Sequence, residues 1–423
     1  MADRRGILKA LGPGFLFAAV SVGVSHLVQS TRAGAGYGLT LGIVIVLAMA
    51  LKYPLFEFGQ RYAAATGTSL LEGYRKQGKW TLVVYMILTI GTMFTVLAAV
   101  TAVTAGLAFQ LTGLDLSTPL WSALLIAACA VLIAVGRYPL LDKAIKLIMA
   151  LLTVSTVAAV IAALPKFSGV DLWGPVDLTS VAAMGFIVGL VGWMPTGMDV
   201  AAWQSFWALA RRRQTGYTPS LRETLFDFRL GYIGTGVLAL LFLCLGTAVM
   251  FVEGVTPQKK AVDFAGQLID LYTNTLGAWS RPVIGIAAFT TMFSTTLTVI
   301  DGFPRALHLT CRRFFGPETQ KEVAASAVRT LGFWAWAGIL IAGGMGIILF
   351  FMKDLLSLVN LATILSYVTG PFLGILAYRA MTAADVPEAY RPGRALRIHA
   401  IVGIVFLVGF FLFYLSTMDW SAS

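Results

Sequence analysis

Ionisable side chains stand inside two apolar segments of this chain, beside residues that break helices. His26 lies in residues 23–26 of the first segment, and Asp199 follows residues 194–197 of the second. Burying an ionisable group in an apolar segment is costly, so both residues are candidates for function. An imidazole, with an ordinary pKa of about 6.5, can bind a ligand or carry a proton. A carboxylate in such a place can attract a cation.

Aromatic side chains accompany the carboxylate. Trp193 precedes Asp199, while Trp203 and Trp207 follow it at spacings of four and eight residues, which puts them on one helical face. A carboxylate beside indole rings suits an organic cation or a bulky complex. In the alternative, Trp203 and Trp207 face lipid or the membrane interface, because the basic residues 211–213 follow within two turns.

Ordinary structural roles are also open for the ionisable groups. His26 could be a buried side chain that is satisfied by hydrogen bonds, and Asp199 could form an ion pair with Arg32 or Lys52. Either arrangement would compensate a buried polar group without involving a ligand.

The elements that hold these residues are expected to be membrane-spanning helices. Of the 423 residues, 58% are hydrophobic and only 12% are charged, and the mean hydropathy is +0.82. A soluble domain carries about 25% charged residues, and a membrane span needs about 20 apolar ones. We predict eleven spans, at about residues 13–37, 39–62, 80–111, 119–136, 142–164, 180–208, 228–252, 280–302, 330–351, 355–378 and 396–416.

Spans one and six each carry a break near mid-depth. Residues 23–26 interrupt the first, and residues 195–197, with Pro195 and Gly197, interrupt the second. A break that faced lipid would leave backbone N–H and C=O groups unpaired, so it must line a cavity or be buried in protein. Paired breaks that open two successive groups of five spans are typical of transporters with a midplane site.

A substrate site is therefore expected between the two breaks. Of its residues, His26 and Asp199 are also the candidates for proton coupling. The sequence predicts no catalytic residue, no cofactor and no metal site. The expected substrate-binding residues are Gly23, Ser25, His26, Met194, Thr196, Gly197, Asp199 and Trp203.

Smaller features complete the pattern. Glu57 and Arg61, spaced i and i+4, are expected to form an ion pair. Asp301, at the predicted end of span eight, is expected to be a structural residue of the inner face. The loop 253–279 is expected to contain a short surface helix, and the loop 303–329 a break followed by a helix start.

The net charge of +11 is distributed along the chain in a way that indicates membrane topology rather than a surface that binds nucleic acid. Lys and Arg gather in alternate loops, which by the positive-inside rule puts the N-terminus in the cytoplasm and the C-terminus outside. We expect a multi-pass protein of the plasma (inner) membrane that contacts lipid and no nucleic acid.

Several short motifs resemble those of the Nramp family of divalent-metal transporters, within the superfamily that has the LeuT fold. They are LGPG at 11–14, AGAGYG at 33–38, RYAAATG at 61–67 and the pair Met194-Pro195. The resemblance implies an all-α integral membrane protein with two inverted five-helix repeats and an eleventh helix. It would form a single domain, 1–423, with repeat one at about 13–164, repeat two at about 180–378 and the accessory helix at about 396–416.

The chain departs from the family where the family binds its substrate. The resemblance puts the family's metal-binding Asp-Pro-Gly-Asn at residues 23–26, its span-six histidine at Thr196, and its span-three Asp and Glu at Leu97 and Val100. None of these positions keeps an acidic residue. Divalent cations favour anionic oxygen or imidazole ligands, so a bare divalent ion is not the expected substrate.

The expected function is secondary active transport by alternating access, coupled to an ion, with H⁺ the most plausible. The expected substrate is a metal–chelate complex or an organic cation. The alternative is a proton-coupled transporter of Mn²⁺, Fe²⁺ or Mg²⁺ in which His26, Met194 and Asp199 are replacement ligands. An enzyme is not expected, because no nucleotide-binding loop or catalytic constellation is present in the sequence. A channel is not favoured, because there is no filter motif.

Overall fold

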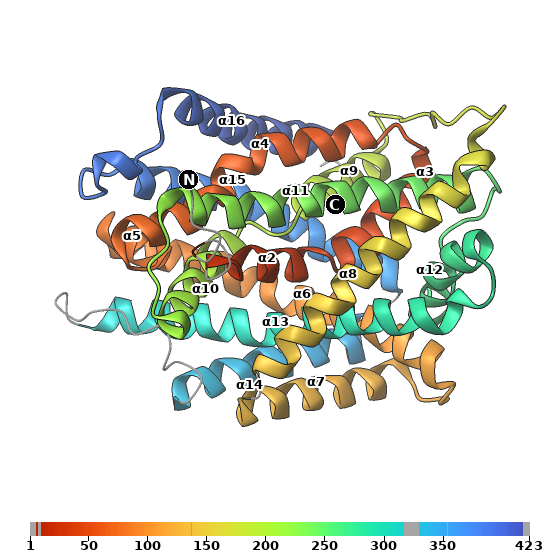
Figure 1. Cartoon of the computed structure of the whole chain (residues 1–423), viewed down its shortest axis with the longest axis horizontal. Coiled ribbons are helices and arrows are strands. Elements are labelled where there is room, and N and C mark those ends of the chain that lie inside the picture. The colour runs from red at the N-terminus through yellow and green to blue at the C-terminus, as the bar shows by residue number, and fades with distance from the viewer. Residues whose placement is uncertain (1–5, 7–9, 137, 317–329, 353, 418–423) are drawn as a thin grey trace.

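The chain folds almost entirely into helices that run side by side (Figure 1). The computed structural model describes residues 6, 10–136, 138–316, 330–352 and 354–417. Within these ranges ten helical segments are long and apolar enough to cross a membrane, and they lie at ten of the eleven predicted spans. The predicted sixth span is divided between two shorter helices, α9 and α10. The helices are α2 (Pro13–Ser21), η1 (Val24–Ser30), α3 (Thr31–Tyr37), α4 (Gly42–Thr66), α5 (Leu70–Lys76), α6 (Lys79–Thr112), α7 (Thr118–Val135), α8 (Tyr138–Ala163), α9 (Val181–Gly192), α10 (Val200–Thr215), α11 (Leu221–Gly246), α12 (Ala261–Leu276), α13 (Ser280–Phe315), α14 (Leu331–Gly346), α15 (Leu355–Thr382) and α16 (Arg394–Thr417).

Span one is broken between α2 and the π-helical turn η1. Only Val22 and Gly23 lie outside a helix there, so the break is shorter than the predicted residues 23–26, and Ser25 and His26 belong to η1. A Cβ on Gly23 would come within 2.9 Å of Thr295 Oγ1 in α13. The break therefore packs directly on α13.

Span six is broken more widely than predicted. Helix α9 ends at Gly192 and α10 begins at Val200, which leaves residues 193–199 outside a helix. The Met194–Pro195 peptide bond in this segment is cis. Asp199 is the N-cap residue of α10 and lies at the end of the break.

The predicted end of span eight at residue 302 is wrong. Helix α13 runs from Ser280 to Phe315 with Pro304 inside it. A proline usually ends a helix in water, but neighbouring helices let membrane spans tolerate one. Gly316 follows as the C-cap, and residues 317–329, where a helix start was expected, lie outside the described residues. The helix expected in loop 253–279 is confirmed as α12.

Glycines bring spans one, two, six and seven into close contact. A Cβ on Gly14 of α2 would lie 2.0 Å from the carbonyl oxygen of Asp227 in α11. In the other direction, a Cβ on Gly231 of α11 would lie 2.2 Å from the carbonyl oxygen of Gly14. A Cβ on Gly59 of α4 would lie 2.0 Å from the carbonyl oxygen of Ala201 in α10. Small residues permit such close approach of helix backbones. These four spans form one tightly packed group.

Helix α16 lies along α4 (Figure 1). Pro54 inside α4 has no N–H, so the carbonyl of Ala50 lacks its usual helical partner. His399 Nε2 of α16 fills this vacancy with a hydrogen bond of 2.8 Å. One turn further on, Gly403 packs against the backbone of Leu51, where a Cβ would lie 2.1 Å from the carbonyl oxygen.

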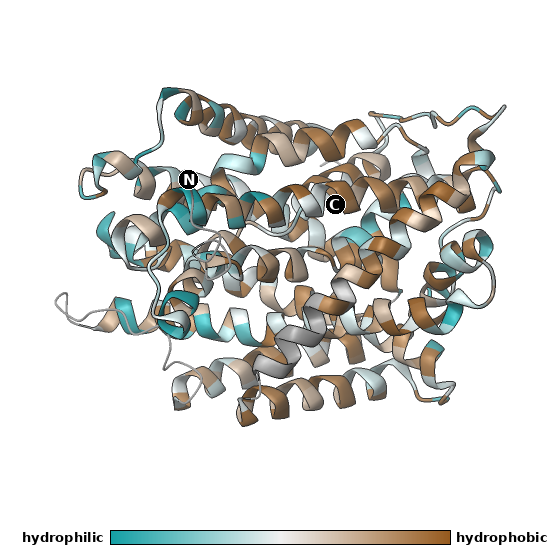
Figure 2. Ribbon diagram, in the orientation of Figure 1, coloured by the Kyte–Doolittle hydropathy of each residue, from teal (hydrophilic) through white to brown (hydrophobic). Residues whose placement is uncertain are grey.

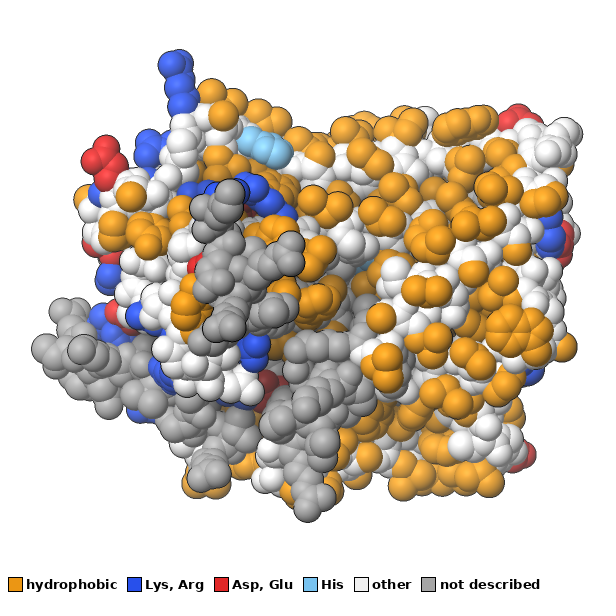
Figure 3. Space-filling model, in the orientation of Figure 1, with side chains coloured by type: hydrophobic (Ala, Val, Ile, Leu, Met, Phe, Trp, Pro, Cys, Tyr) orange, Lys and Arg blue, Asp and Glu red, His pale blue; other side chains and the backbone are white. Residues whose placement is uncertain are grey.

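The surface separates into an apolar body and a basic end. Figure 2 shows hydrophobic residues along most of each long helix and hydrophilic ones mainly near the helix ends. In Figure 3, Lys and Arg gather at the left end, where α5 and α10 lie, whereas orange side chains dominate the rest of this face. This is the surface expected of a chain whose middle faces lipid.

Candidate functional site

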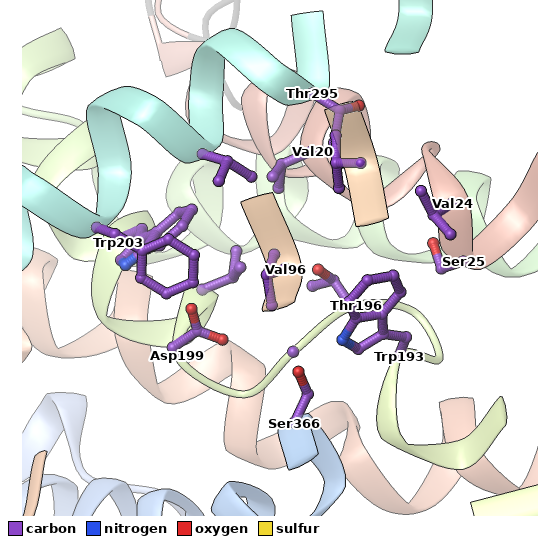
Figure 4. Close-up of a pocket in the computed structure, with 15 residues that line it drawn as sticks. Val20, Val24, Ser25, Val96, Trp193, Thr196, Asp199, Trp203, Thr295 and Ser366 are labelled. Atoms are coloured by element: carbon purple, nitrogen blue, oxygen red, sulfur yellow. The ribbon is translucent and has the colours of Figure 1, made fainter. Parts of the chain in front are cut away.

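A cavity lies where the break of span six faces the break of span one (Figure 4). Its volume is about 40 Å³, counted for the centres of water molecules. A single water needs about 10–15 Å³ on that measure, so the cavity holds a few waters or a small solute. Its walls are Val20, Val24, Ser25, Val96, Val100, Trp193, Thr196, Gly197, Asp199, Val200, Trp203, Thr295, Val299, Phe303 and Ser366.

The polar groups of the cavity come mainly from one side. Figure 4 shows the Asp199 carboxylate and the Ser366 hydroxyl directed into the space, with the Thr196 hydroxyl near its centre. No Lys or Arg among the described residues lies within 4.0 Å of the Asp199 carboxylate. The position of Asp199 at the N-terminus of α10 favours its negative charge. Asp199 is therefore available to a cation in the cavity.

Indole rings close the cavity at its two ends, with Trp193 at one and Trp203 at the other (Figure 4). Trp203 is only 2% exposed and packs perpendicular to Phe303, with ring centroids 4.9 Å apart. A Cβ on Gly302 would lie 2.6 Å from the Trp203 ring, so this glycine makes room for the indole. The alternative that Trp203 faces lipid is wrong, whereas Trp207 is half-buried beside it.

The structure brings five of the predicted site residues to the cavity and keeps three away from it. Ser25, Thr196, Gly197, Asp199 and Trp203 line the space. The residues that do not line it are Gly23, His26 and Met194.

His26 is fully buried and satisfied within the protein. Its Nε2 donates to the carbonyl oxygen of Thr235 in α11 at 2.9 Å, and its Nδ1 lies 2.8 Å from Ser25 Oγ. The Ser25 hydroxyl also bonds the carbonyl of Ser21. This is the arrangement of a structural histidine that ties η1 to α11.

The two basic residues considered as partners of Asp199 have other contacts. Lys52 Nζ donates to three backbone carbonyls, two at the end of α9 and one in the span-six break. Arg32 donates to Gln29 at 2.8 Å and to Asn360 of α15 at 2.9 Å. Neither ion pair with Asp199 is formed.

The ion pair predicted between Glu57 and Arg61 is confirmed, whereas the inner-face position of Asp301 stays a prediction. Arg61 and Glu57 form an ion pair of 2.7 Å. Asp301 pairs with Arg305 at 2.6 Å on α13, which is a structural contact of the kind expected.

The wall supplied by α13 and α15 was missed. Thr295, Val299 and Phe303 of α13 are spaced by four residues and so share one helical face. Their spacing is visible in the sequence, but nothing there relates that face to a cavity. Ser366, from α15, carries no local pattern at all.

A family model described as natural resistance-associated macrophage protein-like matches residues 14–417. The chain belongs to the Nramp family. It is 35% identical over 412 residues to an uncharacterized protein of Pasteurella multocida (strain Pm70), covering 96% of this chain and 92% of that protein.

Solved structures agree on the fold of this Nramp protein. A mutant of the Eremococcus coleocola manganese transporter matches with a TM-score of 0.69 and 14% identity, covering 97% of this chain and 86% of that one. MhsT in complex with L-phenylalanine matches with a TM-score of 0.64 and 14% identity, covering 99% of both chains. The predicted LeuT-like fold is confirmed. As a member of this family the chain is a multi-pass membrane transporter.

The positions where this Nramp protein departs from its family lie at or near the cavity. Val100 and Thr196 line it, at positions that the family resemblance gives to a glutamate and a histidine. Leu97 is fully buried and close to Gly344 of α14. Among the described residues, no group of three or more His, Cys, Asp or Glu could hold a metal ion.

Proposed function

We propose that this Nramp protein is a proton-coupled secondary transporter that carries a small organic cation by alternating access. The observation that carries the proposal is one carboxylate, Asp199, in a cavity closed by Trp193 and Trp203. An organic cation needs one counter-charge and apolar or aromatic walls, and indole faces attract cations. Apart from the ring of Phe303, the rest of the wall is aliphatic or bears neutral hydroxyls.

The same donor set argues against a bare divalent ion. Such an ion gives up part of its water shell only to several oxygen or imidazole ligands, usually including more than one anion. The cavity supplies one carboxylate and the hydroxyls of Ser25, Thr196, Thr295 and Ser366. Transport of bare Mn²⁺, Fe²⁺ or Mg²⁺ with replacement ligands is thus not favoured, since His26 and Met194 do not line the space.

The size of the cavity supports an organic cation over a metal–chelate complex. A volume of about 40 Å³ suits a compact cation. A metal–chelate complex would require a much larger opening. The fold itself is compatible with an organic substrate, because MhsT was solved in complex with L-phenylalanine.

Proton coupling and the transport movement are assigned to the same broken spans that form the cavity. Asp199 is our first candidate for the proton carrier because it lines the cavity, and His26 is the second. Spans one, two, six and seven, packed through glycines, would move as one group against the other spans. The two repeats, at about 13–164 and 180–378, supply the matching halves of this movement, with the protein in the plasma membrane.

The test is uptake into proteoliposomes under a proton gradient imposed in each direction in turn, with guanidinium, choline and Mn²⁺ as probes. Wild-type protein should take up at least one of the two organic cations saturably. Asp199→Asn should lower this uptake by about 10–150-fold, since a charge-assisted contact contributes about 1.5–3 kcal/mol. Asp177→Asn, in an exposed loop, is the matched control and should leave uptake unchanged.

Two outcomes would overturn the proposal. Saturable Mn²⁺ entry that is lost in Asp199→Ala would restore metal transport with a rebuilt site. Saturable uptake of a Mn²⁺–citrate complex, without uptake of guanidinium or choline, would identify a chelate transporter instead.

A further inference from the structure

A buried ammonium group occupies the break of span six. Lys52 of α4 is only 1% exposed. Its Nζ donates to the carbonyl oxygens of Val191 at 2.9 Å, Gly192 at 3.0 Å and Thr196 at 3.3 Å. Two of these carbonyls end α9 and the third belongs to the unwound segment, so one charge joins both sides of the break.

The positive charge of Lys52 is compensated by backbone carbonyls rather than by a nearby carboxylate. Within the described part of the chain, no carboxylate lies within 4.0 Å of Lys52. The ring centroid of Phe56 lies 5.5 Å from Nζ, and Asp199 attracts the ammonium from beyond 4.0 Å. A buried charge is tolerated only when it is paired or well hydrogen-bonded. Here the backbone carbonyls provide the hydrogen bonds, and the negative end of the α9 dipole adds to the stabilisation of the ammonium.

Carbonyls at the C-terminal end of a half-helix are the ligands with which broken transporter helices coordinate coupling cations. We infer that Lys52 is a resident cation that takes the place of a bound monovalent ion at this break. The break then requires no ion from solution. Because the Thr196 carbonyl is held by Lys52 while its side chain lines the cavity, Lys52 is a positioning residue for the site.

This inference concerns the backbone of the site and does not depend on the substrate. Truncating Lys52 would leave three carbonyl oxygens around a space shaped for one small cation. Methylammonium, which matches the end of the lysine side chain, should enter that space. Tetramethylammonium has no N–H to donate and should not bind there.

The experiment compares purified full-length wild type, Lys52→Ala and Lys52→Met by thermal unfolding in detergent. Both variants should have a lower Tm than wild type, because three buried carbonyls lose their donor. Methylammonium should restore at least half of the Tm loss of Lys52→Ala, since a ligand that binds only the folded state stabilises it. Lys52→Met should show no such recovery, because its side chain fills the space.

The controls separate this site from the substrate cavity. Methylammonium bound beside Asp199 would raise the Tm of all three proteins alike, so the inference rests on the difference between Lys52→Ala and Lys52→Met. Equal shifts in the two variants would overturn it, as would recovery with tetramethylammonium. If Lys52→Ala does not fold, a Lys52→Met protein as stable as wild type would overturn it as well.

Discussion

At the scale of single residues, Trp203 would contribute to both the shape and the charge recognition of the substrate. It is buried against Phe303, is given room by Gly302, and shares the cavity with Asp199. An indole in this place would contribute both apolar area and attraction for a cation.

Replacing Trp203 with Leu should therefore weaken substrate binding more than turnover. A cation–π contact contributes about 0.5–2 kcal/mol, so the KM for organic-cation uptake should rise by about 2–30-fold, with a smaller change in the maximal rate. Trp80→Leu is the control, because Trp80 is 53% exposed at the start of α6. Equal effects of the two substitutions would show that Trp203 has no specific role in the cavity.

The sequence could predict part of this site and not the rest. Asp199 and Thr196 were found because a carboxylate and a helix break are conspicuous in an apolar segment. For His26 the sequence left two roles open, a ligand and a buried side chain satisfied by hydrogen bonds, because its acceptor, the carbonyl of Thr235, is 209 residues away. Ser366 could not be predicted, since its side chain reaches the cavity only through packing of distant helices.

At the scale of helices, the junction of α16 with α4 depends on two local defects. Pro54 leaves a carbonyl that His399 uses, and Gly403 permits the backbones to touch at Leu51. Helix α16 also contacts α9 and α15. The eleventh helix is thus joined to two spans of the glycine-packed group, two and six, and to span ten.

Gly403→Val should lower the Tm markedly, because its Cβ would lie 2.1 Å from the Leu51 carbonyl oxygen and the helices would have to separate. Overpacking of this kind costs about 1–3 kcal/mol. Gly409→Val, on the same helix, meets nothing within 4 Å and is the matched control for helix propensity. A Tm loss of the same size in both variants would contradict the packing explanation.

Helix positions were largely predictable because a span is dictated by hydropathy and length. Span one, for example, was predicted at 13–37 and is observed as Pro13–Tyr37. The extent of α13 was not predictable, because Gly302 and Pro304 are helix-ending residues in water. Packing against Trp203 and other spans overrides that tendency.

At the scale of the whole molecule, the basic end has a consequence for orientation. Lys and Arg gather over the end that carries α5 and α10 (Figure 3). If that end faces the cytoplasm, as the positive-inside rule predicts, the loop after α6 lies outside and the loop after α15 lies inside.

Cysteine labelling of intact cells can test this orientation. A cysteine that replaces the exposed Asp115, after α6, should react with a membrane-impermeant maleimide, whereas one that replaces the exposed Glu388, after α15, should react only after cell lysis. The reverse pattern would refute an N-terminus in the cytoplasm. The division into two repeats and an accessory helix also stays a prediction at this scale.

The ammonium group of Lys52 bears on the range of surroundings in which the transporter can work. An ion taken from the medium fills its site only as far as its concentration allows. A charge carried on the protein's own side chain is present at a fixed effective concentration. A cell in fresh water and a cell in brine would therefore hold the span-six break equally well formed.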